Sequence, residues 1–326
     1  MQIHPMWAAY PELQSELIQT IELIDSRIHL RNKSIEHALV DMMNTGGKLV
    51  RPAYTLLFST FGEDQDPNRA RAFAAAIEVL HMATLIHDDV IDDSPKRRGQ
   101  QTIQSKYGKD IAVYAGDYLF TVSFKLITDY SNSMKQMQIN TKGMEKILMG
   151  EIDQMHLRYN QKITIRNYLT QISGKTAQLF ALSCYSGALE SGQTERFARN
   201  CYYIGSHIGM AFQIKDDILD YTQTTDVFGK PVLEDVKQGI YSAPLIYAMR
   251  KQNATFKELL EKKEQLTNEE TQKIQQLVIN TGGLDEAKRL AGKYTDKALK
   301  LIGQLPDSSE KEIIRNLTLS LLERTI

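Results

Sequence analysis

Hydrophobic positions along the chain recur three and four residues apart, which is the spacing of one face of an α-helix. Leu13, Leu17, Ile21, Ile24 and Ile28 form one such stripe, and similar stripes follow over most of the sequence. Segments with the alternating apolar and polar residues of a half-buried strand are missing. The pattern therefore predicts an all-α protein.

Capping and breaking residues suggest where the helices begin and end. Ser34 is a suitable N-cap for a short helix through Met43, which Gly46-Gly47 would end. Pro52 suits the first turn of the next helix. Further helices are expected over about 68–92, 110–130, up to 158, from 165 past 176, 195–220, and from 256 to the end.

Composition limits the class of protein. The chain has 326 residues and a formal net charge of −1, which does not favour a nucleic-acid partner. No Pro/Gly/Ser-rich linker divides it, so we expect a single domain over 1–326. We expect neither a signal peptide nor a transmembrane segment, because no basic start or apolar run of about 18 residues is present. Cys184 and Cys201 lie in apolar helical patterns and indicate reduced core residues of a cytoplasmic protein.

Two acidic clusters share one spacing. Residues four apart lie on one helix face, so Asp88 and Asp92 should lie roughly 6 Å apart along the axis. Stacked carboxylates on a core-facing side are costly unless a cation neutralises them. Carboxylates without Cys or clustered His suit Mg²⁺ rather than Zn²⁺, with water and substrate phosphate completing its coordination. The clusters are Asp88-Asp89-Val90-Ile91-Asp92 and Asp216-Asp217-Ile218-Leu219-Asp220.

Other interpretations of the clusters are solvated acidic helix ends and calcium loops. The apolar residues before each cluster and the basic residues near it argue against solvated ends. A calcium loop would need alternating Asp ligands and a central Gly, which neither cluster has. We therefore expect two metal sites facing each other, with a phosphorylated substrate between them.

Basic residues near these clusters suit phosphate. Lys48 and Arg51 flank a predicted helix start, where free N–H groups favour anions, although two surface cations remain an alternative. His81 lies two turns before Asp88 on the same face, and otherwise would be a core histidine. Lys175 lies within an apolar helix and needs a counter-anion, which a substrate diphosphate could provide.

Six motifs in order resemble those of the trans-polyprenyl diphosphate synthases, over about Gly46 to Pro244. This resemblance implies a single large orthogonal helical bundle of the isoprenoid synthase type with a central cavity. The matching segments are Gly46-Gly47-Lys48-Leu49-Val50-Arg51-Pro52, Asp88 to Asp92 with Arg97-Arg98, Gly150 to Gln154, Lys175-Thr176, Phe212 to Asp220, and Gly229-Lys230-Pro231.

The resemblance also implies the roles of these residues. Isopentenyl diphosphate would be held by Lys48, Arg51, His81 and Arg98. The allylic diphosphate would be held, directly or through Mg²⁺, by Asp88, Asp92, Arg97, Lys175, Thr176, Gln213, Asp216 and Lys230. Asp89, Asp217 and Asp220 would support or share the metals. The Glu151 and Gln154 pair would face the cavity, unless it is a plain polar surface pair.

Such an enzyme ionises the allylic substrate, and the isopentenyl double bond attacks the carbocation in an apolar cavity. In the family, residues four and five positions before the first Asp limit product length. Here they are the small Thr84 and Ala83, although a helical wheel places Ala83 off the metal face. We predict a hexaprenyl to octaprenyl product, such as a quinone side-chain precursor. Farnesyl or geranylgeranyl products would need another floor, which Phe120 or Phe124 could supply.

The sequence departs from the family after Lys230. Leu233-Glu234 replaces a glycine-containing pair, and Ile240 stands where many members have Lys. We expect a homodimer with transient membrane contact for product release. A catalytic subunit that requires a small regulatory partner is the alternative. A terpene cyclase would need neither two aspartate motifs nor the cations for a second substrate.

Overall fold

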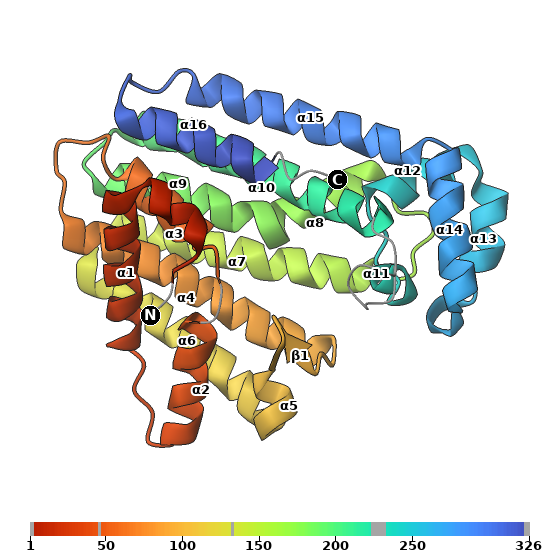
Figure 1. Ribbon diagram of the computed structural model, residues 1–326, viewed down its shortest axis with the longest axis horizontal. Coiled ribbons are helices and arrows are strands. Elements are labelled where there is room, and N and C mark those ends of the chain that lie inside the picture. The colour runs from red at the N-terminus through yellow and green to blue at the C-terminus, as the bar shows by residue number, and fades with distance from the viewer. Residues whose placement is uncertain (1–2, 45–46, 132–133, 223–232, 323–326) are drawn as a thin grey trace. The chain divides into compact units, whose positions relative to one another are not determined.

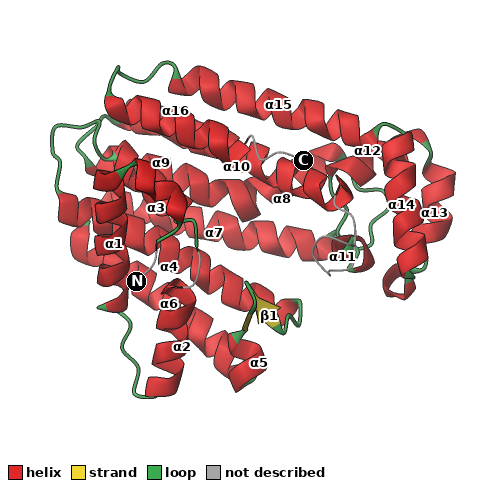
Figure 2. Cartoon of the chain, viewed as in Figure 1, coloured by secondary structure: helices red, strands yellow, loops and turns green. Residues whose placement is uncertain are grey.

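Figure 1 shows the computed structural model of the chain, which describes residues 3–44, 47–131, 134–222 and 233–322. Helices make up most of the described residues, and the strands form one short hairpin (Figure 2). The predicted all-α class is confirmed. The elements are η1 (Pro5–Ala9), α1 (Pro11–Asp25), α2 (Lys33–Asn44), α3 (Val50–Phe58), α4 (Pro67–Ile91), β1 (Lys96–Arg97), β2 (Gln100–Gln101), α5 (Ile103–Tyr107), α6 (Lys109–Tyr130), α7 (Met134–His156), α8 (Ile165–Ile172), η2 (Ser173–Ala177), α9 (Gln178–Glu190), α10 (Glu195–Thr222), α11 (Glu234–Lys237), α12 (Ala243–Lys251), α13 (Asn253–Leu260), η3 (Lys263–Gln265), α14 (Asn268–Asn280), α15 (Gly283–Ile302) and α16 (Ser309–Leu322).

Two helix starts differ from those predicted. Ser34 lies inside α2, because the side chain of Asn32 accepts the Ser34 N–H at 3.1 Å and the helix starts at Lys33, two residues earlier than a Ser34 N-cap predicts. The Ser34 N-cap prediction is wrong by that margin. Helix α3 begins at Val50, ahead of Pro52, directly after Leu49 in the left-handed conformation.

The helices group into two compact units, which are described separately. Unit 1 comprises residues 1–141 and 182–202, and unit 2 comprises 142–181 and 203–326. Helices α7, α9 and α10 contribute residues to both units. The single domain predicted for the whole chain stays a prediction.

The core of unit 1 lies along α4. This helix packs over much of its length against α6, and α1 and α3 also contact it (Figure 1). All five residues of the first hydrophobic stripe, Leu13 to Ile28, are buried, as predicted. Cys184 and Cys201 are buried and free in the same unit, and burial raises the pKa of both thiols. Both behave as core residues, as predicted.

Helix α6 is, by length and composition, a candidate membrane span among the described residues, which the sequence analysis did not anticipate. Its packing against α4 is what a core helix also shows, so the composition is weak evidence for a membrane.

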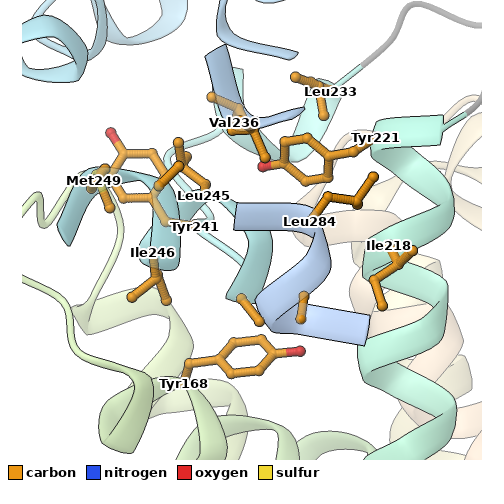
Figure 3. Packing of buried hydrophobic residues seen from close by; sticks show 14 of the residues in the cluster. Tyr168, Ile218, Tyr221, Leu233, Val236, Tyr241, Leu245, Ile246, Met249 and Leu284 are labelled. Carbon is orange, nitrogen blue, oxygen red and sulfur yellow. The ribbon is translucent and has the colours of Figure 1, made fainter. Parts of the chain in front are cut away.

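The core of unit 2 gathers residues from α8, α10, α12 and α15. Figure 3 shows Tyr168, Ile218, Tyr221, Leu245 and Leu284 packed together. Tyr168 comes from α8 and Ile218 from α10, so this hydrophobic core packs α8 against α10, the helix that carries the second acidic cluster.

Candidate active site

The first acidic cluster lies at the C-terminal end of α4. Asp88 is half-buried, Asp89 is buried and Asp92 is exposed. The Asp92 N–H donates to the carbonyl oxygen of Asp88 at 2.8 Å, so Asp92 closes the helix. Asp88 and Asp92 are therefore one turn apart on the same helix, as the spacing predicted.

Asp89 has a partner on the hairpin that follows. One oxygen of its carboxylate accepts hydrogen bonds from Arg97 Nε at 2.9 Å and Arg97 Nη2 at 2.8 Å. The Asp89 side chain is only 4% exposed, so this is a largely desolvated ion pair. The pair fixes the hairpin against the end of α4.

The hairpin places Arg98 at a tight turn. Lys96 pairs with Gln101 and Arg97 with Gln100, which leaves Arg98 and Gly99 as a two-residue loop. Both loop residues have positive φ, 51° and 81°, as a type I′ turn requires. Arg98 is strained there, since a side chain disfavours this conformation.

Arg98 reaches the segment that precedes α3. A Cβ atom added to Gly47 would lie 3.3 Å from Arg98 Nη1 and 3.8 Å from Glu78 Oε1. Gly47 therefore allows the guanidinium and the carboxylate to approach the backbone closely. Glu78 is buried in the middle of α4, and Arg51 also acts on it electrostatically.

The arginines set the charge of the neighbouring groups. Burial raises the pKa of Glu78, and Arg51 and Arg98 oppose that rise. Burial, assisted by Arg51, Arg98 and Arg97, lowers the pKa of His81 well below its ordinary value. His81 is therefore a neutral imidazole at neutral pH, which can donate one hydrogen bond without adding charge. Unit 1 thus concentrates cations around a buried acid and a neutral histidine.

A cavity of about 90 Å³ lies beside this hairpin. Arg97, Arg98 and Lys106 line it together with Met42 and Met82. Asp41 and Asp89 also line it, so its walls within unit 1 combine cationic, acidic and apolar side chains.

The second acidic cluster lies near the C-terminal end of α10 and repeats the burial pattern of the first. Asp216 is half-buried, Asp217 is buried and Asp220 is exposed. Burial raises the pKa of Asp217 to about 8, hydrogen bonds oppose the rise, and Asp235 and Asp220 add to it.

Asp217 is held by a network within unit 2. Tyr168 donates its hydroxyl to Asp217 Oδ2 at 2.5 Å, and Gln213 donates its amide to Asp217 Oδ1 at 2.8 Å. The amide oxygen of Gln213 in turn accepts the hydroxyl of Thr176 at 2.6 Å. This network connects α8, η2 and α10.

Lys175 lies in η2, a π-helical turn that often marks functional sites. Its Nζ donates to Glu151 Oε2 at 2.8 Å and to Gln154 Oε1 at 2.9 Å. Glu151 therefore supplies a protein counter-anion for Lys175, where the sequence suggested a substrate diphosphate. The Glu151 and Gln154 pair points to Lys175 and is half-buried.

The donor set of each acidic cluster can be compared with the needs of a metal. Within 3–44, 47–131, 134–222 and 233–322, no three His, Cys, Asp or Glu side chains gather as a ready-made metal centre. Each cluster offers two carboxylates one turn apart on a helix. That set fits a hard cation that takes one or two protein carboxylates and completes its shell with water or phosphate. Gly46, Gly229, Lys230 and Pro231 lie outside the described residues.

Comparisons with known proteins decide the family. The polyprenyl synthetase family model matches residues 32–280. The chain belongs to this family. It is 34% identical to heptaprenyl diphosphate synthase component 2 of Geobacillus stearothermophilus, over 97% of this chain and 98% of that protein.

Solved structures agree with this polyprenyl synthetase assignment. Geranylgeranyl pyrophosphate synthase of Lactobacillus brevis ATCC 367 is 44% identical with a TM-score of 0.94, covering 98% of this chain and 99% of that one. Heptaprenyl diphosphate synthase of Staphylococcus aureus is 34% identical with a TM-score of 0.90, covering 96% and 99%. The resemblance inferred from the motifs and the isoprenoid synthase type of fold are confirmed.

Two residues of the candidate site were not predicted from the sequence, Glu78 and Tyr168. Glu78 is an acid inside an apolar helix, three residues before His81, and that isolation was its signal. Tyr168 lies on the apolar face of α8, where a core position is the ordinary interpretation.

The candidate chain-length residues lie on α4. Ala83 is fully buried in the core of unit 1, and Thr84 is largely buried, with its hydroxyl donating to the carbonyl oxygen of His81 at 2.7 Å. Phe120 packs on His87, with ring centroids 5.5 Å apart, while Phe124 is exposed. His87 Nε2 also lies 3.1 Å from the Val113 carbonyl oxygen.

The family departure after the undescribed segment has a local consequence. Leu233 has φ of 60° before α11, a conformation that favours glycine. The glycine-containing pair usual in the family would relieve that strain.

Proposed function

We propose that this polyprenyl synthetase condenses isopentenyl diphosphate with an allylic diphosphate in a Mg²⁺-dependent reaction. The observation that carries the proposal is the repeated burial pattern of the acidic clusters. In each, a half-buried and an exposed carboxylate flank a buried one that has its own protein partner. The outer carboxylates of each cluster lie one turn apart on their helix, and we propose that each pair binds a magnesium ion, Asp88 with Asp92 and Asp216 with Asp220.

The middle aspartates have a supporting part in this proposal. Arg97 bonds Asp89, while Tyr168 and Gln213 bond both oxygens of Asp217. We therefore assign Asp217 to fixing the end of α10, in place of the ligand role expected from the sequence. Arg97 would fix the hairpin through Asp89 and could still present its other N–H groups to an allylic diphosphate.

Isopentenyl diphosphate would bind to the cations of unit 1. Lys48, Arg51 and Arg98 supply positive charge, and neutral His81 adds a hydrogen bond. Bound Mg²⁺ would supply Lewis-acid neutralisation of the allylic diphosphate as its C–O bond breaks. Lys175, Thr176 and Gln213 in unit 2 would hold that diphosphate, with Lys230 as a further proposed contact.

The proposed product is a hexaprenyl to octaprenyl diphosphate for quinone side chains. The small side chains of Ala83 and Thr84 support it, as does the similarity to heptaprenyl diphosphate synthases. A geranylgeranyl product is the second candidate, favoured by the 44% identity to the Lactobacillus enzyme. Product length separates the two directly.

A homodimer is the proposed assembly. Helix α6 exposes Ile111, Val113, Tyr114 and Phe124, an apolar surface on unit 1 that a second copy could cover. The alternative is a heterodimer with a small regulatory subunit, since the Geobacillus relative is named as component 2. We propose a cytoplasmic enzyme, with transient membrane contact when the product leaves.

The test uses the purified chain alone with Mg²⁺, farnesyl diphosphate and labelled isopentenyl diphosphate. Products are dephosphorylated and separated by chain length. A ladder that ends at about six to eight units supports the proposal, and a stop at four supports the second candidate. No incorporation by the wild type, alone or with a small partner subunit, would reject the transferase function. A product formed without isopentenyl diphosphate would indicate a terpene cyclase.

A further inference from the structure

A tryptophan from the first helical turn reaches the segment before α3. Trp7 lies in η1 and is fully buried. Its indole N–H donates to the carbonyl oxygen of Lys48 at 2.9 Å, across 41 residues of sequence. A buried indole N–H needs an acceptor, and here the acceptor is the backbone of a proposed substrate-binding residue.

That segment, residues 47–49, has a strained backbone that other residues must hold in place. Leu49 is in the left-handed conformation, with φ of 49° and ψ of 35°, and no side-chain cap starts α3. A strained backbone persists only when its surroundings hold it. The segment also lies close to Arg98, since a Cβ atom added to Gly47 would lie 3.3 Å from Arg98 Nη1. Its position therefore decides how Lys48 and Arg51 lie relative to Arg98.

We propose that Trp7 is a positioning residue for the isopentenyl diphosphate site. Its hydrogen bond to Lys48 holds segment 47–49 in the strained conformation that brings Lys48 and Arg51 to one anion together with Arg98. The identity of that anion rests on the proposed function. Trp7 itself does not contact the substrate in this proposal.

The test compares Trp7→Phe with Tyr118→Phe. Tyr118 also donates to a backbone carbonyl, that of His29 at 3.0 Å, on a part of unit 1 remote in sequence from segment 47–49. Trp7→Phe loses one hydrogen bond and part of a buried ring, whereas Tyr118→Phe loses two hydrogen bonds, because the Tyr118 hydroxyl also accepts the His29 N–H at 2.7 Å. Binding of isopentenyl diphosphate alone is measured by calorimetry, and KM for each substrate and kcat are measured by turnover.

Trp7→Phe should bind isopentenyl diphosphate about fivefold more weakly, the effect of one hydrogen bond. Its KM for isopentenyl diphosphate should rise equally, with the allylic KM and kcat within about twofold of wild type. Tyr118→Phe should also lose thermal stability, through its two lost hydrogen bonds, with unchanged affinity for isopentenyl diphosphate. Equal affinities in the two variants would overturn the proposal.

A second measurement uses the wild-type chain and does not depend on a variant folding. Trp7 is the sole tryptophan, so its emission reports on this position alone. Emission should change with isopentenyl diphosphate concentration, with a midpoint equal to the calorimetric Kd. Binding without any change in emission would overturn the proposal. Binding without turnover would reject the proposed function and leave the positioning role in place, whereas no binding at all would reject both.

Discussion

Gly150 offers a sharp test of how closely α7 must approach η2. A Cβ atom added at position 150 would lie 2.6 Å from the backbone nitrogen of Lys175 and 2.9 Å from backbone atoms of Gly174. Ordinary contact begins at 3.4 Å, so Gly150→Ala must separate the two backbones by about 0.8 Å. The obstructing atoms are backbone, which cannot turn away as a flexible side chain can.

The matched control is Gly292→Ala in α15, where an added Cβ atom meets nothing within 4 Å. That substitution should raise the free energy of unfolding by about 0.5–1 kcal/mol, because alanine favours the helix. Gly150→Ala gains the same stabilisation from the helix propensity of alanine, but overpacking lowers its free energy of unfolding by about 1–3 kcal/mol. The two variants should therefore differ by about 1–3 kcal/mol.

Separating α7 from η2 should also lower the activity of the enzyme. Lys175 Nζ holds Glu151 and Gln154 at 2.8 and 2.9 Å, distances that a shift of this size would disturb. We expect kcat/KM for the allylic substrate to fall on the order of tenfold to a hundredfold. Gly292→Ala should keep wild-type kinetics.

Urea denaturation and steady-state kinetics on both variants measure these effects. A Gly150→Ala protein as stable as Gly292→Ala, with unchanged kcat/KM, would show that α7 and η2 are not held at this distance.

Three further predictions concern metal, product and pH. Chelation should abolish incorporation until Mg²⁺ is restored, and Asp216→Asn should lower kcat at least about a hundredfold, because several kcal/mol of charge stabilisation are lost; normal turnover by this variant would remove Asp216 from the metal site. Thr84→Phe should shorten the product ladder to three or four units, since bulk would replace a small side chain on α4; an unchanged ladder would show that chain length is limited elsewhere. Glu190 has both carboxylate oxygens buried without hydrogen bonds, and burial raises its pKa from 4.5 to about 8 against the opposing effect of Arg69. The pKa of Glu190 is higher in the folded protein than in the unfolded chain. Its contribution to the free energy of unfolding is therefore complete below about pH 4.5 and is lost as the pH rises to about 8, on the order of 5 kcal/mol. Glu190→Gln should remove that slope from a series of urea titrations between pH 5 and 9, and the exposed Glu258→Gln should keep it.

The helical spacing of apolar residues in the sequence predicted most of the helices and their buried faces. Helical spacing was enough to place Asp88 and Asp92 one turn apart and to identify the buried stripe that ends at Ile28. These features depend on neighbours within a single helix, where spacing alone determines direction.

Partners distant in the chain could not be found in that way. The bond between Tyr168 and Asp217 spans 49 residues, and that between Trp7 and Lys48 spans 41. The position of Lys175 in an apolar helix correctly predicted that it needs a counter-anion. Glu151 lies next to Lys175 only because Gly150 and Gly174 let α7 and η2 approach each other closely. Tertiary packing decides such pairs.

The buried middle aspartate of each cluster has a consequence for changing the enzyme's metal. Its position depends on Arg97 in one cluster and on Tyr168 with Gln213 in the other. The outer carboxylates, which are the proposed metal ligands, can therefore be exchanged for other donors while the helix end that carries them stays in place. Substitutions at the outer positions could then change the selectivity between metal ions without changing the stability of the fold.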